Sequence, residues 1–387
     1  MACRVQDNGA ASAMELIAEH GFEGLAEALV LLINEAMRME RERHLGAAPY
    51  ERGEGRRGYA NGFKPKTVKS RLGELRLAVP QVREGGFYPQ SLEKGLRSER
   101  ALKLALAEMY VTGVSTRKVA RITETLCGFE VSSTEVSRCA ARLDGELSAW
   151  RERPLGEFRY VLLDARYEKV RHGGQVIDCA VLIAMGVAAT GKREILGISV
   201  ALSEAEVHWR AFLQDLVARG LHGVRLIVAD DHAGLKAARA AIFPAVPWQR
   251  CQFHLQQNAA AYVPRQAMRK KVAADIRDIF NAPDDAEARR LIERFVKAYA
   301  KSAPKLASWA ETALPEGLAV YAVPDAHRRR LRTTNALEGL NKEIRRRTRV
   351  ATLFPNEAAC LRLVTAIAME TSDEWLTGRI YLNMSEE

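Results

Sequence analysis

The sequence predicts a protein of the α/β class, in which helical regions flank a mixed β-sheet. Apolar residues recur at helical spacing over residues 12–45 and again within 95–150. Residues 158–229 contain strand-like stretches and end in a continuously apolar run, 224–229, which is typical of a buried central strand. Residues 255–320 are rich in alanine and charge and lack strand character, which predicts an all-helical block.

The composition excludes several classes of protein. The chain has 387 residues, of which 48% are hydrophobic, so we expect two or three domains with a sizeable core. No apolar run approaches the ~18 residues of a membrane span, and the first residues lack the apolar stretch of a signal peptide. The six cysteines are scattered without a Cys-x-x-Cys pair, as in reduced intracellular proteins. A cytoplasmic location without membrane contact is therefore expected.

The first region, residues 1–95, is predicted to be mainly helical and basic. Its helices are followed by an exposed basic loop over 50–66 and a small hairpin over 67–82, with Gly73 at the turn. Residues 56–83 hold eight basic residues against one acid. Clustered positive charge attracts phosphate backbones, although an ordinary solvated surface is the alternative interpretation.

Residues 96–152 are predicted to form a helix-turn-helix-like DNA-binding domain. Ser115 can cap a first helix, residues 127–129 break it, and Ser132 with Glu135 forms a capping box for a second helix. Such a pair of helices can place the front of the second helix against DNA, but an ordinary helical hairpin is an equally good interpretation. The residues expected to contact DNA are Ser115, Arg117, Ser133, Thr134, Ser137 and Arg138.

Residues 153–365 are predicted to form the catalytic domain. The order of its elements is three strands, helix, strand, helix, which is the order of a ribonuclease-H-like sheet. A helical insertion is expected over about 251–325, and residues 366–387 are expected to form a C-terminal tail. The strands are predicted over 158–164, 176–188, 194–202 and 224–229, and the helices over 205–219 and 234–242.

Three acidic residues occupy positions at which a carboxylate is expected to have a partner or a bound metal. Asp164 lies within the first strand, Asp230 ends the apolar strand, and Glu338 lies in the first turn of a basic helix predicted over 335–349. An ionised carboxylate at a buried strand end is costly unless it is paired or bound to metal. Carboxylates from two neighbouring strands and a packed helix would form an all-oxygen pocket, which suits Mg²⁺ or Mn²⁺. A pair of such ions can support in-line displacement at a phosphodiester.

Each acid can also have a purely structural role. Asp164 can pair with Arg166 or Lys169. Asp230 can cap the helix that follows it, a role open equally to Asp231. Taken together, and in the order of a ribonuclease-H-like sheet, the acids favour a metal site.

The basic helix that carries Glu338 contains further candidates. Glu338 can be the capping-box partner of Asn335, which is its structural alternative. Arg345, Arg346 and Arg347 lie two turns beyond, and an i, i+7 step returns to the same helix face, so Arg345 aligns with Glu338. These arginines are expected to hold a DNA phosphate beside the acids, with a solvated basic helix as the alternative.

Five ordered segments then point to a known family. They read YVLLDARY from Tyr160, FLQDLVARGL from Phe212, DDHAGLKAA from Asp230, WQRCQFH from Trp248 and TTNALE from Thr333. In these segments the chain resembles the Mutator-family transposases of bacterial insertion sequences. Segments at 57–62 and 113–117 also fit, so the similarity covers nearly the whole chain.

The resemblance implies a DDE-type transposase. Its two aspartates would fall on Asp164 and Asp230 and its glutamate on Glu338. Such an enzyme would bind double-stranded DNA at the terminal inverted repeats of its element, and would cleave and join strands with Mg²⁺ or Mn²⁺, as two ions. A homodimer or higher oligomer is expected, because two ends must be brought together. The alternatives are an inactive or domesticated transposase that only binds DNA, and a metal-dependent nuclease without joining activity.

The pair Cys251 and His254 needs its own interpretation. Two ligands do not complete a structural zinc site, which takes four, and no second Cys/His pair lies at finger spacing. Members of the family that the chain resembles carry this Cys-x-x-His after their second aspartate. We therefore interpret Cys251 and His254 as structural residues near the metal pocket, where His254 can hydrogen-bond a carboxylate or a phosphate.

Overall fold

The structure is a computed structural model of the chain, which describes residues 9–51, 55–83, 86–92, 94, 98–111, 114–349 and 353–386. The chain divides into two compact units, Met1–Arg142 and Leu143–Glu387. The domain boundary predicted between residues 95 and 96 lies outside the described residues. In the described part of the chain, every helix is too short or too polar to cross a bilayer.

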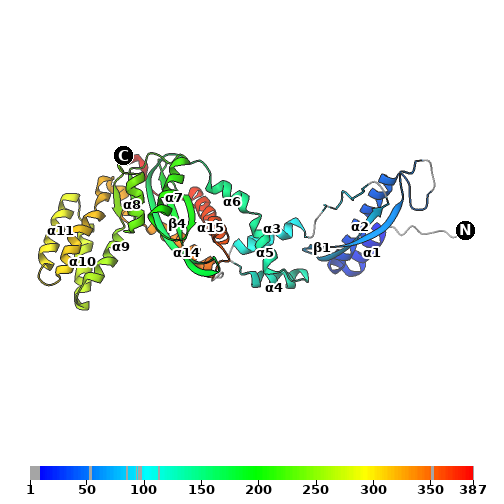
Figure 1. Cartoon of the computed structure of the whole chain (residues 1–387), viewed down its shortest axis with the longest axis horizontal. Coiled ribbons are helices and arrows are strands. Elements are labelled where there is room, and N and C mark those ends of the chain that lie inside the picture. Colours follow the sequence, from blue (N-terminus) through cyan, green and yellow to red (C-terminus); the bar gives the residue numbers. More distant parts are fainter. Residues whose placement is uncertain are drawn as a thin grey trace. The chain divides into compact units, whose positions relative to one another are not determined.

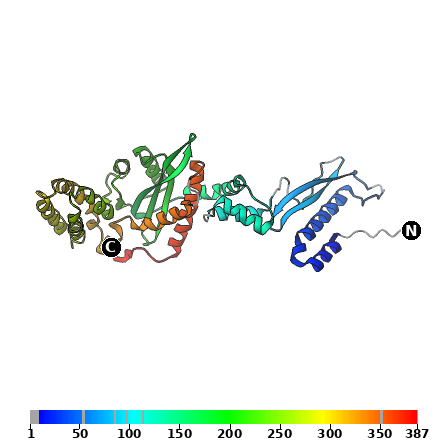
Figure 2. The same cartoon turned by 90° about the horizontal axis from the view of Figure 1, so that it is seen from below.

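The first unit begins with two helices and a β-hairpin. Helix α1 (Gly9–His20) packs on α2 (Leu25–Leu45), and α2 lies along the hairpin of β1 (Ala60–Ser70) and β2 (Gly73–Val82) (Figure 2). The tight turn requires Gly73, whose φ of +113° lies in the region that favours glycine. The predicted helices and hairpin are confirmed.

The start of β1 corrects one prediction. The segment 50–66 was expected to be a loop, but from Ala60 onward it belongs to the strand. The first six residues of β1 are all exposed, so they lack the alternation of apolar and polar residues by which a strand is recognised in a sequence.

Three helices complete the first unit and pack against one another. They are α3 (Arg100–Val111), α4 (Thr116–Cys127) and α5 (Ser133–Ala141). Val119 of α4 and Val136 of α5 are fully buried between them.

The caps of α4 and α5 form as the sequence predicts. The Ser115 hydroxyl caps α4 and the Ser132 hydroxyl caps α5, and Gly128 ends α4 with a φ of +71°. The reciprocal half of the capping box is absent, because the Glu135 carboxylate accepts a hydrogen bond from Ser98 instead.

The second unit is built on a five-stranded mixed sheet with the strand order β5-β4-β3-β6-β7. Strands β3, β4 and β5 form an antiparallel meander, and β6 and β7 run parallel to β3. The α/β class is therefore confirmed. The strands are β3 (Phe158–His172), β4 (Gln175–Ala188), β5 (Arg193–Ala201), β6 (Leu226–Ala229) and β7 (Trp248–Arg250).

Strand β7 was not predicted from the sequence. It has only three residues and contains the polar side chains of Gln249 and Arg250, so neither its length nor its composition marks it as a strand. The buried Gln249 amide stabilises it from the side, because it donates to the Gly317 carbonyl and accepts from the Val320 amide.

The register of the two central strands positions the candidate site. Leu162 of β3 lies opposite Val228 of β6 in a parallel pair. Asp164 and Asp230 each lie two residues further along. Since side chains alternate with a period of two, the Asp164 carboxylate points to the same face of the sheet as Leu162, and Asp230 is the first residue after β6.

Helices cover both faces of this sheet (Figure 1). Helices α7 (Glu206–Ala218) and α8 (Ala233–Ile242) cover one face, around the buried Trp209. Helices α14 (Asn335–Thr348) and α15 (Glu357–Thr377) cover the other face, where Leu162 and Val228 are buried. Asp164 therefore lies on the side of α14, and Asn341 of that helix contacts it.

Two elements cross the boundaries that the sequence suggested. Helix α6 (Asp144–Arg151) packs on α15 in the second unit, with Asp144 paired to Arg362 at 2.6 Å. Helix α15 continues past residue 365 to Thr377, because buried residues such as Ile367 extend its apolar face.

The predicted helical insertion is present after β7. It has a core of its own, which includes Ile276, Phe295 and Leu306, and residues 252–331 contain no strand. Helix α13 (Asp325–Leu331) leads from it back to α14. Its other helices are α9 (Gln252–Ala259), α10 (Arg269–Phe280), α11 (Asp285–Tyr299) and α12 (Pro304–Ala313), with short 3-10 turns at Ala260–Tyr262 (η2) and Leu314–Gly317 (η4).

Candidate active site

Asp164 is a half-buried carboxylate whose two oxygens are both held in place. Its Oδ1 accepts from the Ala165 amide at 2.9 Å, and its Oδ2 accepts from Asn341 Nδ2 at 2.6 Å. Burial raises the pKa of Asp164 to about 6, and the nearby charge of Asp230 adds to the rise. The hydrogen bonds from Ala165 and Asn341, together with the charge of His254, limit the rise.

Asp230 lies directly after β6 and faces His254. Its Oδ1 is 2.6 Å from His254 Nδ1, and both atoms are buried. The two groups are close but poorly aligned, so neither atom has a well-directed hydrogen bond among the described residues. The contact with Asp230, helped by Cys251, raises the pKa of His254 to about 10, so the imidazole is a cation at neutral pH.

The structural alternatives for the two aspartates are not realised. Arg166 pairs with Glu168 at 2.5 Å, and Lys169 pairs with Asp178 at 3.2 Å. Asp164 therefore has no arginine or lysine partner among the described residues.

The helix-cap alternative for the second aspartate also fails. The residue that caps α8 is His232, and no side chain supplies a cap hydrogen bond. Asp231 instead pairs with Arg250 at 2.9 Å and with Lys236 at 3.6 Å. Asp231 thus has cationic partners of its own, although it lines the candidate pocket together with Asp230.

Asp164 and Asp230 line a pocket of about 270 Å³ that also includes His254. Glu204, in the connection between β5 and α7, lines the same pocket and lies 3.7 Å from His232. Glu204 was not among the predicted site residues, because a carboxylate in a connecting loop has no periodic pattern to mark it.

Glu338 does not line this pocket. Its carboxylate is 3.7 Å from Lys342 on the same helix, and its side chain is 44% exposed. Asn341, which lies one turn beyond Glu338 on α14, makes the contact with Asp164 instead. Asn341 was not among the predicted site residues, although its i+3 spacing from Glu338 places it on the same helix face.

The capping box expected between Asn335 and Glu338 is not formed. Helix α14 begins after Thr334, whose side chain accepts no capping hydrogen bond, and Asn335 is an exposed residue of its first turn. Asn335 therefore does not reach the pocket, and Glu338 is not used to cap the helix.

Cys251, His254 and Asp230 form a cluster whose donor atoms lie within 4.8 Å of one another. Cys251 is fully buried, and Thr334 Oγ1 donates to its Sγ at 3.5 Å. Burial opposes ionisation of the thiol, but His254 and Thr334 lower the pKa of Cys251 below its ordinary value. A zinc ligand must be a neutral imidazole, so a metal here would have to displace the proton of a strongly basic His254. The cluster is better explained as the support that orients Asp230.

The three arginines of α14 have different environments. Arg345 is exposed. Arg346 pairs with Glu343 at 2.6 Å, and hydrogen bonds from Arg346 and Arg347 lower the pKa of Glu343 to about 2. Arg347 is buried and also pairs with Glu370 at 2.6 Å, so its guanidinium is committed to the fold.

The predicted DNA-contacting residues of the first unit lie on the outside of α4 and α5. Ser115 is half-buried because it caps α4, and the remaining residues are exposed. The exposed residues are Arg117, Ser133, Thr134, Ser137 and Arg138.

The donor set of the pocket fits a hard divalent cation. Two carboxylates converge from neighbouring strands, and each oxygen of Asp164 retains a lone pair beyond its single hydrogen bond. Asp230 lines the same pocket, with its Oδ1 2.6 Å from His254 Nδ1, so a cation bound at this oxygen requires the imidazole to turn away or to lose its proton. Oxygen donors of this kind suit Mg²⁺ and Mn²⁺.

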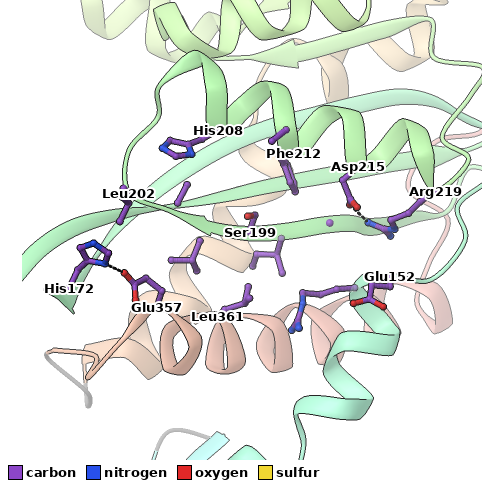
Figure 3. Close-up of a pocket in the computed structure, with 16 residues that line it drawn as sticks. Glu152, His172, Ser199, Leu202, His208, Phe212, Asp215, Arg219, Glu357 and Leu361 are labelled. Atoms are coloured by element: carbon purple, nitrogen blue, oxygen red, sulfur yellow. Dashed lines mark hydrogen bonds and ion pairs between the residues drawn. The ribbon is translucent and has the colours of Figure 1, made fainter.

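A larger cavity of about 560 Å³ lies elsewhere, at the outer edge of β5 between α7 and α15 (Figure 3). Two pairs of polar side chains line it, Asp215 with Arg219 at 3.2 Å and His172 with Glu357. Among the described residues it shares none with the carboxylate pocket, so cavity size does not identify the candidate active site here.

The fold and pocket together define an α/β protein with a candidate metal-binding active site. Its sequence matches the family described as "Transposase, Mutator family" over residues 5–378. The chain therefore belongs to the Mutator family of transposases, as the sequence motifs predicted.

Individual relatives are also named as transposases of insertion sequences. The chain is 61% identical over its whole length, and over the whole relative, to the transposase for insertion sequence element IS406 of Burkholderia multivorans. It is 44% identical to the transposase for ISRM5 of Rhizobium meliloti, over 94% of this chain and 92% of the relative. It is 36% identical to the transposase for IS256 in transposon Tn4001 of Staphylococcus aureus, over 92% of this chain and 93% of the relative.

Proposed function

We propose that this chain is a DDE-type DNA transposase. It binds the terminal inverted repeats of its insertion sequence and carries out metal-dependent strand cleavage and strand transfer. The observation that carries the proposal is the convergence of Asp164 and Asp230 in one pocket, where burial holds the pKa of Asp164 at about 6. A carboxylate kept in so unfavourable an environment is typical of a site that binds a cation.

The catalytic core is proposed to be ribonuclease-H-like. In support, the sheet combines an antiparallel meander of three strands with two strands parallel to β3, and helices cover both faces. The helical insertion between Asp230 and Glu338 fits the same proposal.

Glu338 is proposed as the third acidic residue. Helix α14 is already fixed against β3 through Asn341 and Asp164. Glu338 is partly exposed, and among the residues that the structure describes its ion pair is with Lys342 at 3.7 Å, a weak contact for an exposed pair. Rotation of its side chain away from Lys342 is the change that the proposal requires when DNA and metal bind.

Asp164, Asp230 and Glu338 would hold Mg²⁺ or Mn²⁺, as two ions. The metal would activate a water or a 3′-hydroxyl and stabilise the leaving oxygen of the phosphodiester. The protein's own groups prepare the site: Asn341 fixes the Asp164 carboxylate, and the His254 cation fixes Asp230.

DNA binding is proposed to use the first unit and the exposed end of α14. The exposed face of α5 carries Ser133, Thr134, Ser137 and Arg138, which can reach phosphates and base edges. On α14, Arg345 is the arginine available for a phosphate, since Arg347 is buried between two glutamates. Joining two element ends calls for a dimer or a higher oligomer on DNA.

The test uses duplex DNA that carries the inverted repeats flanking the coding region. With Mg²⁺, the wild-type chain should cut at the repeat boundary and join the released 3′ end to target DNA. Asp164→Asn, Asp230→Asn and Glu338→Gln should each abolish both steps and leave DNA binding intact. Asp178→Asn, which changes an exposed carboxylate of β4, should cut and join normally.

Three results would reject parts of the proposal. Full activity of any one of the three variants removes that residue from the site. Binding to the repeats without cleavage by the wild-type chain favours the alternative, an inactive or domesticated transposase. Cleavage without joined products would instead indicate a nuclease.

A further inference from the structure

Arg166 is a largely buried cation two residues beyond Asp164 on β3, with a side chain that is 15% exposed. The pairing of β3 with β4 is regular at this point, so Arg166 lies on the same face of the sheet as Asp164. It is not among the described residues that line the carboxylate pocket. Burial of a charge is costly unless its partners compensate for the lost water, so those partners indicate its role.

The Arg166 guanidinium joins β3 to α14. Its Nη1 donates to the main-chain carbonyl oxygen of Asn341, and its Nη2 lies 2.5 Å from Glu168 Oε1. The same oxygen of Glu168 accepts from Thr348 Oγ1 at 3.2 Å. One planar fork therefore connects the middle of α14 to a carboxylate that is itself bound to the end of that helix.

Asn341 is held by β3 from two directions. Its side chain donates to Asp164 Oδ2 at 2.6 Å, and its main-chain carbonyl accepts from Arg166. The contact between Thr348 and Glu168 adds a third point, two turns further along α14. Contacts at two levels of one helix fix its rotation as well as its position, and the rotation of α14 sets the direction in which Asn341 points.

The contact also contains two buried polar atoms that have no partner among the described residues. Arg166 Nε has no acceptor, and Asn341 Oδ1 has no donor. Buried groups of this kind lower the stability of a folded protein. An apolar side chain at position 166 would leave neither a buried charge nor an unpaired Nε, so stability alone does not explain an arginine here.

We propose that Arg166 is a positioning residue of the candidate active site, which holds Asn341 in place on the Asp164 carboxylate. This inference rests on the proposed function. Arg166 acts through Asn341 and α14, without contact to metal or DNA. The role requires a guanidinium, because two of its nitrogens reach a carbonyl and a carboxylate at the same time, which a single ammonium group does not reproduce.

The first measurement is the affinity of the full chain for Mn²⁺, followed by electron paramagnetic resonance. Arg166→Met removes the fork and should weaken binding by about 10- to 100-fold, as is typical of residues that orient a metal ligand. Arg166→Lys keeps the charge and should recover only part of this loss. Arg171→Met is the matched control, an exposed arginine of the same strand, and should bind Mn²⁺ like the wild type.

A double variant tests whether Arg166 acts through Asn341. Asn341→Ala removes the donor to Asp164 and should itself weaken Mn²⁺ binding. If the two residues act as one unit, the combined variant should lose less affinity than the product of the two single losses. Two arginine and asparagine roles that are independent would instead multiply.

Hydrogen–deuterium exchange of the metal-free chain tests the contact apart from metal binding. Arg166→Met should speed amide exchange in α14 and leave α7, on the other face of the sheet, unchanged. The matched control should leave both helices unchanged.

Three outcomes overturn the inference: unchanged exchange in α14, single losses of Mn²⁺ affinity that multiply, or full recovery of affinity in Arg166→Lys. Failure of the proposed function is a separate result, since it appears as a wild-type chain that neither binds Mn²⁺ nor cuts DNA. In that case the exchange of α14 still decides whether Arg166 holds the helix on β3.

Discussion

At the scale of single residues, the environment of Asp164 decides how the candidate site behaves. The side chain is half-buried, and two donors hold its oxygens, so its carboxylate has a fixed direction. Without metal, the burial of this carboxylate lowers the free energy of unfolding of the protein. A cation would remove that cost, which couples metal binding to stability.

Asp164→Asn should stabilise the metal-free protein at pH 7.5. The ordinary pKa of an aspartate, 3.8, rises to about 6 at Asp164, so the folded chain binds this proton more tightly than the unfolded chain. The stability linked to this group is present below pH ~4 and is lost as the pH rises through 6. A difference of about two in pKa corresponds to about 3 kcal/mol, which the uncharged asparagine should recover.

Urea unfolding in EDTA at pH 7.5 and at pH 4 measures this effect. The gain for Asp164→Asn should be largest at pH 7.5 and nearly absent at pH 4. Asp178→Asn, at an exposed position, should show no such dependence on pH. A destabilised Asp164→Asn chain at pH 7.5 would mean that the carboxylate is not strained in the fold.

Asn341→Ala should shift the acid side of the activity profile. Asn341 donates to the Asp164 carboxylate, and a hydrogen bond to a charged group contributes about 1.5–3 kcal/mol. Without it the pKa of Asp164 should rise by about 1–2, because 1.36 kcal/mol corresponds to one pKa unit. The pH at which Mg²⁺-dependent cleavage reaches half its maximum should rise accordingly.

The measurement is a pH–rate profile at saturating DNA, with repeat binding measured in parallel. Asn341→Ser keeps a hydroxyl donor and should recover part of the shift. An unchanged pH–rate profile for Asn341→Ala would show that Asn341 does not affect the ionisation that controls cleavage.

At the scale of elements, α14 connects the candidate residues. Glu338, Asn341 and Arg345 all lie on this helix, so its position against β3 sets the site. Gly339 is in its interior, and an added Cβ there meets nothing within 4 Å. Gly339→Ala should therefore stabilise the protein by about 0.5–1 kcal/mol, the difference between the two residues in a helix. Thermal unfolding checks this, and a lower melting temperature would contradict it.

Gly234→Ala should have the opposite effect. A Cβ at Gly234, in the first turn of α8, would lie 2.2 Å from the Glu204 carbonyl oxygen and 2.8 Å from the Glu206 amide nitrogen. These are backbone atoms, so the connection from β5 to α7 must move. Overpacking of this kind costs about 1–3 kcal/mol, and it should also lower activity because Glu204 lines the pocket. Unchanged stability would contradict this prediction, because it would mean that the connection from β5 to α7 moves at little cost in free energy.

Several elements and residues were predictable because local patterns define them. The apolar run of β6, the caps at Ser115 and Ser132, and the helix face of α14 all follow from periodicity or capping chemistry. Asp164 and Asp230 were predictable as candidates because each is a carboxylate in or at the end of an apolar strand.

Other features depend on contacts that the sequence does not reveal. Strand β7 is stabilised by the Gln249 amide, and β1 begins in a segment with no apolar alternation. Asn341 reaches Asp164 only because α14 packs on β3, and Glu204 reaches the pocket only through the path of a connecting loop. Tertiary packing, rather than local preference, places each of them.

At the scale of the whole molecule, the two compact units have separate cores. The hairpin core around Met37 belongs to the first unit, and the two faces of the five-stranded sheet belong to the second. Domains with their own cores generally unfold as separate cooperative units.

Calorimetry of the full chain should therefore resolve two unfolding transitions. Asp164→Asn should move only the transition of the second unit, because the buried carboxylate lies there. A single transition that moves as a whole would contradict independent units.

The central claim is that Asp164, Asp230 and Glu338 hold divalent metal together. It is tested most directly by a crystal structure of the chain on its repeat DNA with Mn²⁺, in which anomalous scattering locates the ions. The account predicts anomalous density between the three carboxylates, with Glu338 turned away from Lys342. Density bound elsewhere, or a Glu338 side chain still paired with Lys342, would contradict it.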